Sequence, residues 1–398
     1  MKSSNASLSS LPAKGLSEER RALVVAGIAH ALHDGFTDMI YVLLPVWQTE
    51  FGLGYGSLAL LRALYSGSMA GLQVSAASVA DRFGGRGVLA IGTALAAFGF
   101  LLAGLTGTIA LLCVALVVAG AGSSTQHPIG SAAVSRAYRG RAREPLGIYN
   151  FCGDIGKAVI PVGISLLITL MSWRAALLRV ALLGLAVAIA IAVLMPSVDR
   201  KSTGTDGGGA GGRTGKSGGF PLLFMIGVLD TAVRMGFLTF LPFVLRAKGA
   251  NLSTVGLGLS LVFIGGAAGK FACGWLGARI RLLGTVLITE GGTAVAILSI
   301  LVLNLRPALI VLPLLGIMLN GTSSVLYGTV PELTKGDLAE RSFALFYTGT
   351  IGSGAIAPVL YGALGDVVGA SWATFATAMS ALATIPLAIA LSSRMAPD

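Results

Sequence analysis

The stretch from residue 22 to residue 47 reads ALVVAGIAHALHDGFTDMIYVLLPVW and is long enough to cross a lipid bilayer as a helix. Its middle nevertheless carries four ionisable side chains, those of His30, His33, Asp34 and Asp38. A charge at the bilayer centre costs at least about 2.5–3.5 kcal/mol, so such residues mark a functional site or an ion path by default. The stretch therefore predicts a membrane-spanning helix whose polar face meets protein or water.

Ionisable residues recur at the same depth in other apolar segments. Each lies nine to twelve residues from a charged flank, which is roughly 13–18 Å along a helix and close to the bilayer middle. They are Asp34, His127, Asp154, Lys157, Asp230, Lys270 and Glu290. Seven such residues in one layer predict a polar cavity at the midplane, where secondary transporters bind their cargo.

The composition identifies an integral membrane protein. Only 11% of the residues are charged, against about 25% in a soluble domain, and the mean hydropathy is +0.84. The net charge of +11 is spread over short loops, so we expect no nucleic-acid partner. The three cysteines form neither a disulfide framework nor a metal spacing. We expect no enzyme activity, no cofactor and no metal.

Twelve apolar segments of spanning length can be counted, and they predict an all-α protein. Their limits are 22–47, 57–80, 87–107, 109–134, 145–170, 173–195, 220–246, 253–277, 282–304, 307–330, 341–364 and 369–391. Most of the 28 Lys and Arg residues lie in the termini and in alternate loops. By the positive-inside rule, this pattern predicts a multi-pass plasma-membrane protein with both termini in the cytoplasm.

A Gly-rich stretch divides the chain into two related halves. The two halves echo each other at an offset of 197 residues, where Pro45 matches Pro242 and Gln73 matches Lys270. This duplication predicts two six-helix bundles. The expected parts are a tail at 1–21, a bundle at 22–196, a linker at 197–219, a bundle at 220–392 and a tail at 393–398.

The polar residues of the first span form one ribbon on a helix. His30, Asp34 and Asp38 repeat every four residues, and the row that begins at His33 lies beside them. A desolvated carboxylate at this depth is suited to carry a proton. We therefore predict proton coupling by Asp34 with His30, Asp38 and His127; a structural hydrogen-bond network between helices is the alternative. His127 precedes Pro128, which we expect to kink the fourth span.

Buried cations predict contact with an anionic group. Asp154 and Lys157 are three residues apart, and Asp230 and Arg234 are four apart, so each pair can neutralise itself on one helix. Lys270 has no acidic residue in its own span and must meet a substrate anion or an acid on another helix. The predicted substrate-binding residues are Lys270, Lys157, Arg234, Asp154, Asp230, Gln73, Asn150, Tyr327 and His33.

The short loop between the second and third spans is a candidate gate. Asp81, Arg82 and Arg86 place acid and base at a tight turn, where they can clasp neighbouring helix ends. We expect such a clasp to stabilise an outward-open state and to break when the inner side opens.

Several motifs point to one family of membrane proteins. They are His30-x-x-x-Asp34, Leu44-Pro45, Glu50-Phe51-Gly52, Asp81-Arg82-Phe-Gly-Gly85-Arg86, Gly122-Ser123-Ser124-x-x-His127-Pro128 and Gly153-x-x-Gly156 with Pro161. Together with Gln73 in the second span, they resemble the major facilitator superfamily and, within it, the fosmidomycin-resistance family of exporters. The resemblance implies the major facilitator fold and export by substrate/proton antiport.

The sequence therefore predicts a secondary active transporter that works by alternating access. The leading expectation is a monomeric, proton-coupled exporter of a small organic anion or zwitterion. Proton-coupled uptake of such an anion is one alternative, and a non-transporting membrane receptor or scaffold on a transporter fold is another.

Overall fold

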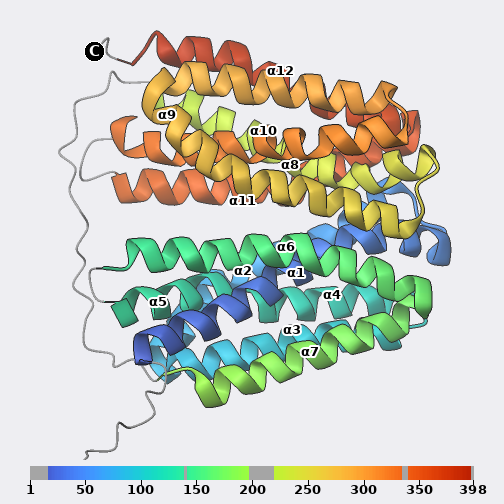
Figure 1. Ribbon diagram of the computed structural model, residues 1–398, viewed down its shortest axis with the longest axis vertical. Helices are drawn as coiled ribbons and strands as arrows, with labels where there is room; N and C mark the ends of the chain where they lie inside the picture. The colour runs from blue at the N-terminus through green and yellow to red at the C-terminus, as the bar shows by residue number, and fades with distance from the viewer. Residues whose placement is uncertain (1–16, 139–140, 197–218, 334–338, 396–398) are drawn as a thin grey trace, which may run out of the picture.

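The computed structural model describes residues 17–138, 141–196, 219–333 and 339–395. Within these ranges the chain is helical and contains no strand. Figure 1 shows two stacked sets of helices, one formed by the N-terminal half and one by the C-terminal half. Residues 197–218 of the expected linker, and residues 1–16 and 396–398 of the two expected tails, lie outside the described residues.

The N-terminal set comprises six membrane-spanning segments. Ser17 caps the first helix by accepting a hydrogen bond from the Arg20 amide, and Gly52 ends it in the left-handed conformation with φ 62°. The helices are α1 (Glu18–Phe51), α2 (Tyr55–Phe83), α3 (Gly85–Leu105), α4 (Ile109–Ser123), α5 (Ser131–Tyr138), α6 (Arg143–Leu170) and α7 (Trp173–Leu194).

The fourth span is broken where the sequence predicts a kink. A π-helical turn, η1 (Gln126–Gly130), separates α4 from α5 and contains Pro128. Proline has no amide hydrogen, so the regular helical ladder cannot continue through it. The break confirms the predicted kink and turns the polar residues of η1 toward α1, as the hydrogen bond between His127 and His33 shows.

The C-terminal set begins at α8 (Gly219–Ala247) and continues with α9 (Leu252–Val302), α10 (Leu305–Thr329), η2 (Val330–Leu333), α11 (Ala339–Val368) and α12 (Ala370–Ser392). The 51 residues of α9 would extend about 77 Å if straight, far beyond a core about 30 Å thick. Figure 1 shows that α9 turns back on itself.

The sequence predicts that the helix stops between the spans 253–277 and 282–304. That prediction is wrong, because helical structure runs through the turn. The prediction of two crossings still holds, because Leu252–Lys270 and Leu282–Val302 are each long and apolar enough to cross a membrane.

Ten stretches of the described residues meet that length and hydropathy requirement. Helices α1 and α2 are not among them, although they contain 34 and 29 residues and lie within the same bundle. In α1 the cause is the polar ribbon in its middle. These two helices complete the twelve spans that the sequence predicts.

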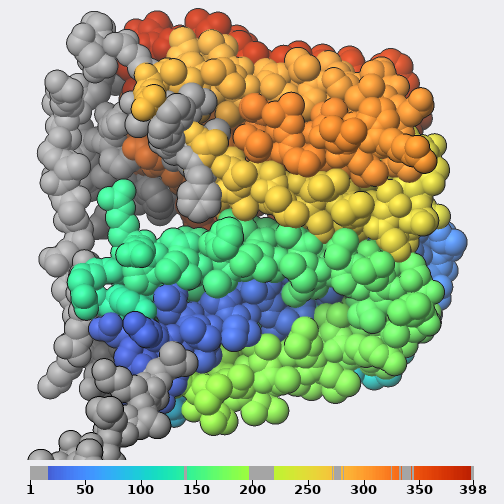
Figure 2. All heavy atoms as spheres, viewed as in Figure 1, coloured from blue at the N-terminus to red at the C-terminus, as the bar shows by residue number. Residues whose placement is uncertain are grey.

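The two bundles meet at the end of the molecule opposite α1's start and α12's end. There the Asp366 carboxylate of α11 accepts hydrogen bonds from the amides of Tyr55 and Gly56 at the start of α2, at 2.5 and 3.0 Å. Nearby, Gly256 of α9 packs directly against Ser165 of α6. Figure 2 shows α6 and α9 in contact along this side of the seam between the bundles.

Candidate functional site

Two glycines of α6 bring the polar ribbon of α1 against α6. A Cβ atom at Gly156 would lie 1.8 Å from the Ala31 carbonyl oxygen, and one at Gly153 would lie 2.5 Å from an Asp34 carboxylate oxygen. Only glycine permits this approach of the two helices. The close packing places the middle of α6, including Lys157, beside Asp34.

Asp34 is the centre of this cluster. Its carboxylate lies 3.3 Å from the Lys157 ammonium group, 3.5 Å from His30 Nε2 and 3.9 Å from His33 Nε2. The Asp34 side chain is 9% exposed, so its charge depends on these neighbours for compensation. Lys157 therefore pairs across two helices, whereas the sequence suggested a pair with Asp154 on its own helix.

Asp154 instead binds Lys270. The Lys270 ammonium group of α9 donates to both Asp154 oxygens, at 2.6 and 2.8 Å. This pair crosses from one bundle to the other. Of the two partners left open for Lys270, the structure shows the acid on another helix. Gln73, which matches Lys270 in the duplicated halves, is half-buried on α2, and its predicted role in substrate binding stays a prediction.

All three histidines of the chain lie in the same cluster. His30 stacks on the Tyr149 ring with centroids 4.1 Å apart, and its Nδ1 lies 2.9 Å from the Tyr149 carbonyl oxygen. The Nε2 atoms of His33 and His127 are 3.3 Å apart. The predicted proton-coupling residues His30, Asp34 and His127 are thus brought together.

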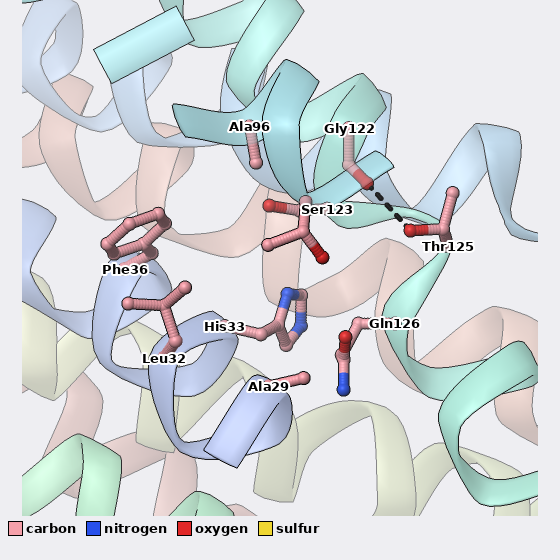
Figure 3. Close-up of a pocket in the computed structure, with 10 residues that line it drawn as sticks. Ala29, Leu32, His33, Phe36, Ala96, Gly122, Ser123, Thr125 and Gln126 are labelled. Atoms are coloured by element: carbon pink, nitrogen blue, oxygen red, sulfur yellow. Dashed lines mark hydrogen bonds between the residues drawn. The ribbon is translucent and has the colours of Figure 1, made fainter. Parts of the chain in front are cut away.

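A small cavity of about 10 Å³, roughly the room for one water molecule, lies beside His33. Figure 3 shows the His33 ring between Ser123 and Gln126, with Phe36 closing one side. The Tyr65 hydroxyl hydrogen-bonds to Ser123 and to Thr37, at 2.8 and 3.1 Å, beside this pocket. The histidine cluster therefore borders polar groups of α2 and of the broken span.

Asp38 lies one turn beyond Asp34 and is equally buried. The positive charges of Lys157 and Arg62 attract the Asp38 carboxylate. Arg62 of α2 is 4% exposed, stacks on the Tyr41 ring at 4.5 Å and donates to the Met235 sulfur of α8. Arg62 is not among the residues predicted from the sequence, although its position inside an apolar segment was a signal that could have found it.

A second polar cluster lies in the C-terminal bundle. Asp230 is 3.8 Å from Arg234, as the sequence predicts, and Arg234 donates to the Asn320 side chain. Glu290 of α9 accepts a hydrogen bond from the Thr322 hydroxyl at 2.6 Å and lies in the same cluster as Asp230. The C-terminal bundle therefore gathers two carboxylates and one guanidinium group in one cluster.

Two of the predicted binding residues, Tyr327 and Asn150, do not belong to the charged groups that form the two clusters. Tyr327 of α10 hydrogen-bonds through its hydroxyl to Thr350 of α11, at 3.1 Å. Asn150 is exposed on α6, one residue after Tyr149.

The predicted gate residues make contacts within the N-terminal bundle. Asp81 lies 3.9 Å from Arg136 of α5, and Arg86 donates to the Met195 carbonyl just after α7. Arg82 lies over the Phe83 ring. These contacts connect neighbouring helix ends, which is the arrangement that a clasp requires. Their effect on conformation stays a prediction.

Comparison with known proteins identifies the family. The family model described as Major Facilitator Superfamily matches residues 26–222. A bacterial homolog of the human lysosomal transporter Spinster, solved in an inward-facing and occupied conformation, superposes with a TM-score of 0.79. That match covers 96% of this chain and 98% of the other, at 14% identity. A mutant of the nucleoside transporter NupG gives a TM-score of 0.77 over 95% of this chain and 100% of the other, at 11% identity.

Three relatives by sequence are also transport or resistance proteins. The Multidrug resistance protein Stp of Mycobacterium tuberculosis is 33% identical over 34% of this chain and 26% of its own length. The "Probable sulfoacetate transporter SauU" of Cupriavidus necator is 24% identical over 82% of each chain. The Fosmidomycin resistance protein of Escherichia coli is 25% identical over 34% of this chain and 33% of its own length.

The fold and these matches define a multi-pass membrane transporter of twelve helices in two bundles. The chain belongs to the major facilitator superfamily. Its resemblance to the fosmidomycin-resistance family agrees with the relatives found.

Proposed function

We propose that this protein is a proton-coupled exporter of a small organic anion or zwitterion, with both termini in the cytoplasm. The observation that carries the proposal is the ion pair between Lys270 and Asp154, because it joins the two bundles through a buried carboxylate and a partly exposed cation. In alternating access the bundles must separate and close again around the cargo. A cargo anion that takes the place of Asp154 at Lys270 couples binding to that movement.

The positions of the other cations in the two polar clusters support an anionic group on the cargo. Lys157, Arg62 and Arg234 lie in the two polar clusters, together with Lys270. A fixed cation attracts an anionic group and repels a cationic one. SauU carries sulfoacetate in its name and matches 82% of this chain, which favours the same class of cargo.

Export is favoured by the names of two relatives, which are resistance proteins. Antiport requires that the proton and the cargo exclude each other. A zwitterion meets this requirement, because its cationic group competes with a proton for Asp34 while its anionic group binds Lys157 or Lys270.

Proton-coupled uptake is the second candidate, and the same ion pair favours it for a cargo that is purely anionic. Protonation of Asp154 would release Lys270, so the proton and the anion would then bind together. The charge of the cargo therefore decides between exchange and co-transport.

Calorimetry on the purified protein tests the proposed cargo class. Sulfoacetate and fosmidomycin are suitable probes, and a cationic dye of similar size is the control. We expect saturable binding of at least one anion, weakened in Lys270→Gln and unchanged in Arg306→Gln, which removes an exposed positive charge. Binding of the dye alone would contradict an anionic cargo.

A further inference from the structure

The histidine cluster has an unpaired atom at its centre. His30 is 3% exposed, and its Nδ1 lies 2.9 Å from the Tyr149 carbonyl oxygen, which can only accept a hydrogen bond. The proton of a neutral His30 ring therefore sits on Nδ1, and Nε2 carries a lone pair. That Nε2 atom has no hydrogen-bond partner among the described residues.

The lone pair of His30 faces another acceptor. Asp34 Oδ2 lies 3.5 Å from His30 Nε2, so two electron-rich atoms meet in a buried space. Such an arrangement calls for a cation between them. Metal-binding histidines have this second contact as a rule, because the ring nitrogen away from the metal donates to a backbone carbonyl or a carboxylate.

The remaining nitrogen atoms lie at suitable distances for a metal ion. In a tetrahedral site with bonds of about 2.0–2.1 Å, neighbouring ligand atoms lie roughly 3.3–3.4 Å apart. His33 Nε2 and His127 Nε2 are separated by 3.3 Å. One ligand atom each from His30, Asp34 and His127 all lie within 4.8 Å of one another. A small contraction would complete the coordination sphere.

We propose that His30, Asp34 and His127 form a binding site for a divalent transition-metal ion, with His33 beside it as the fourth ligand. Two or three imidazole nitrogens and one carboxylate favour Zn²⁺, Co²⁺ or Ni²⁺ over Mg²⁺ and Ca²⁺, which prefer oxygen ligands. The inference reverses the expectation of no metal that the cysteine spacing gave. It does not depend on the proposed transport function, because binding is measured at equilibrium.

Lys157 competes with the metal ion for the Asp34 carboxylate. Its ammonium group lies 3.3 Å from Asp34 Oδ2, and its side chain is 30% exposed. The ammonium group and the metal ion cannot both occupy this side of the carboxylate. Metal binding must displace Lys157, whose long and partly exposed side chain can move. Removal of Lys157 should therefore strengthen metal binding.

Cobalt titration tests the site. The full-length protein is purified without a polyhistidine tag, stripped with EDTA and titrated with Co²⁺, and the visible absorption of tetrahedral cobalt is followed. We expect saturable binding of one ion per chain, displaced by Zn²⁺ and not by Mg²⁺. His30→Ala and His127→Ala should each weaken binding at least tenfold. Glu290→Gln, which changes a buried carboxylate of the C-terminal bundle far from the histidines, should bind as the wild type does.

Two further variants distinguish the loss of metal ligands from misfolding of the protein. His127→Gln keeps a hydrogen-bonding side chain without an imidazole ligand and should also lose binding while eluting as a single species in size exclusion. Lys157→Met should bind Co²⁺ several-fold more tightly than the wild type does. Added Zn²⁺ should raise the unfolding temperature of the Lys157→Met variant. Cobalt binding that is equal in the wild type and both histidine variants, or absent from all, would overturn the proposal and leave a proton as the shared cation.

Discussion

The Lys270 ammonium group on α9 lies within 2.8 Å of both carboxylate oxygens of Asp154 on α6, so one ion pair joins the two halves of the transporter. The Asp154 side chain is 8% exposed and that of Lys270 is 41% exposed. A cargo anion can therefore reach Lys270 more readily than Asp154. This difference makes the pair a contact that cargo can open.

Replacement of Lys270 separates a cargo role from a structural one. We expect Lys270→Gln to lose roughly 2–5 kcal/mol of binding free energy for the cargo anion, because bound cargo covers Lys270 and desolvates the charge contact that the variant lacks. The measurement is calorimetry with the cargo. Asp154→Asn/Lys270→Gln also removes the unpaired carboxylate, so its cargo affinity should stay as low as that of Lys270→Gln. Wild-type affinity in both variants would assign Lys270 to an internal salt bridge.

The pair between Asp34 and Lys157 should behave as a coupled unit in stability measurements. Lys157→Met alone leaves a buried carboxylate without its cation and should cost about 3–5 kcal/mol of unfolding free energy. Asp34→Asn/Lys157→Met removes both charges and should recover most of that loss. Denaturant unfolding in detergent gives the comparison. Equal losses in the single and double variants would show that the two residues do not interact.

Much of this arrangement follows from the sequence, and the pairing of charges does not. Segment length and Pro128 predict the spans and the broken helix correctly, because each depends on local properties of the chain. Which acid meets Lys157 depends instead on the close approach of α1 and α6, which Gly153 and Gly156 permit. That approach places Lys157 against Asp34 and leaves Asp154 for Lys270.

Asp366 illustrates the same limit. Its position near the end of a span marks it as an ordinary loop acid, yet it caps α2 of the other bundle. A carboxylate at a helix N-terminus compensates free amides and the positive end of the helix dipole. Only the packing of α11 against α2 brings it there.

Removal of this cap should open the end of the molecule where Asp366 lies. Asp366→Ala loses both hydrogen bonds between α11 and α2, so spin labels placed on the two bundles at that end should move apart in double electron–electron resonance. Asp366→Asn keeps an acceptor oxygen and should give an intermediate distribution. Glu50→Gln, which breaks a pair with Arg174 inside one bundle, is the control. Unchanged distances in Asp366→Ala would exclude a closing role.

The loop of Asp81 and Arg82 is predicted to act at the opposite end. The contact of Asp81 with Arg136 connects α2 with α5 inside the N-terminal bundle. Replacement of Asp81 and Arg82 by Ala should loosen this connection and favour inward-open states, seen as longer distances between labels across that face. Wild-type distance distributions together with wild-type transport rates would mean that the loop serves only as a topology signal.

Lumenal pH during transport tests the central claim most directly. The protein is reconstituted into liposomes that contain a pH-sensitive dye, with equal pH on both sides, and the cargo is added outside. Proton antiport predicts that the lumen becomes alkaline as cargo enters and protons leave. Asp34→Asn should abolish this change and partly retain exchange of labelled cargo at equal pH. A lumen that becomes acidic would show co-transport instead, and cargo entry without any pH change would contradict proton coupling.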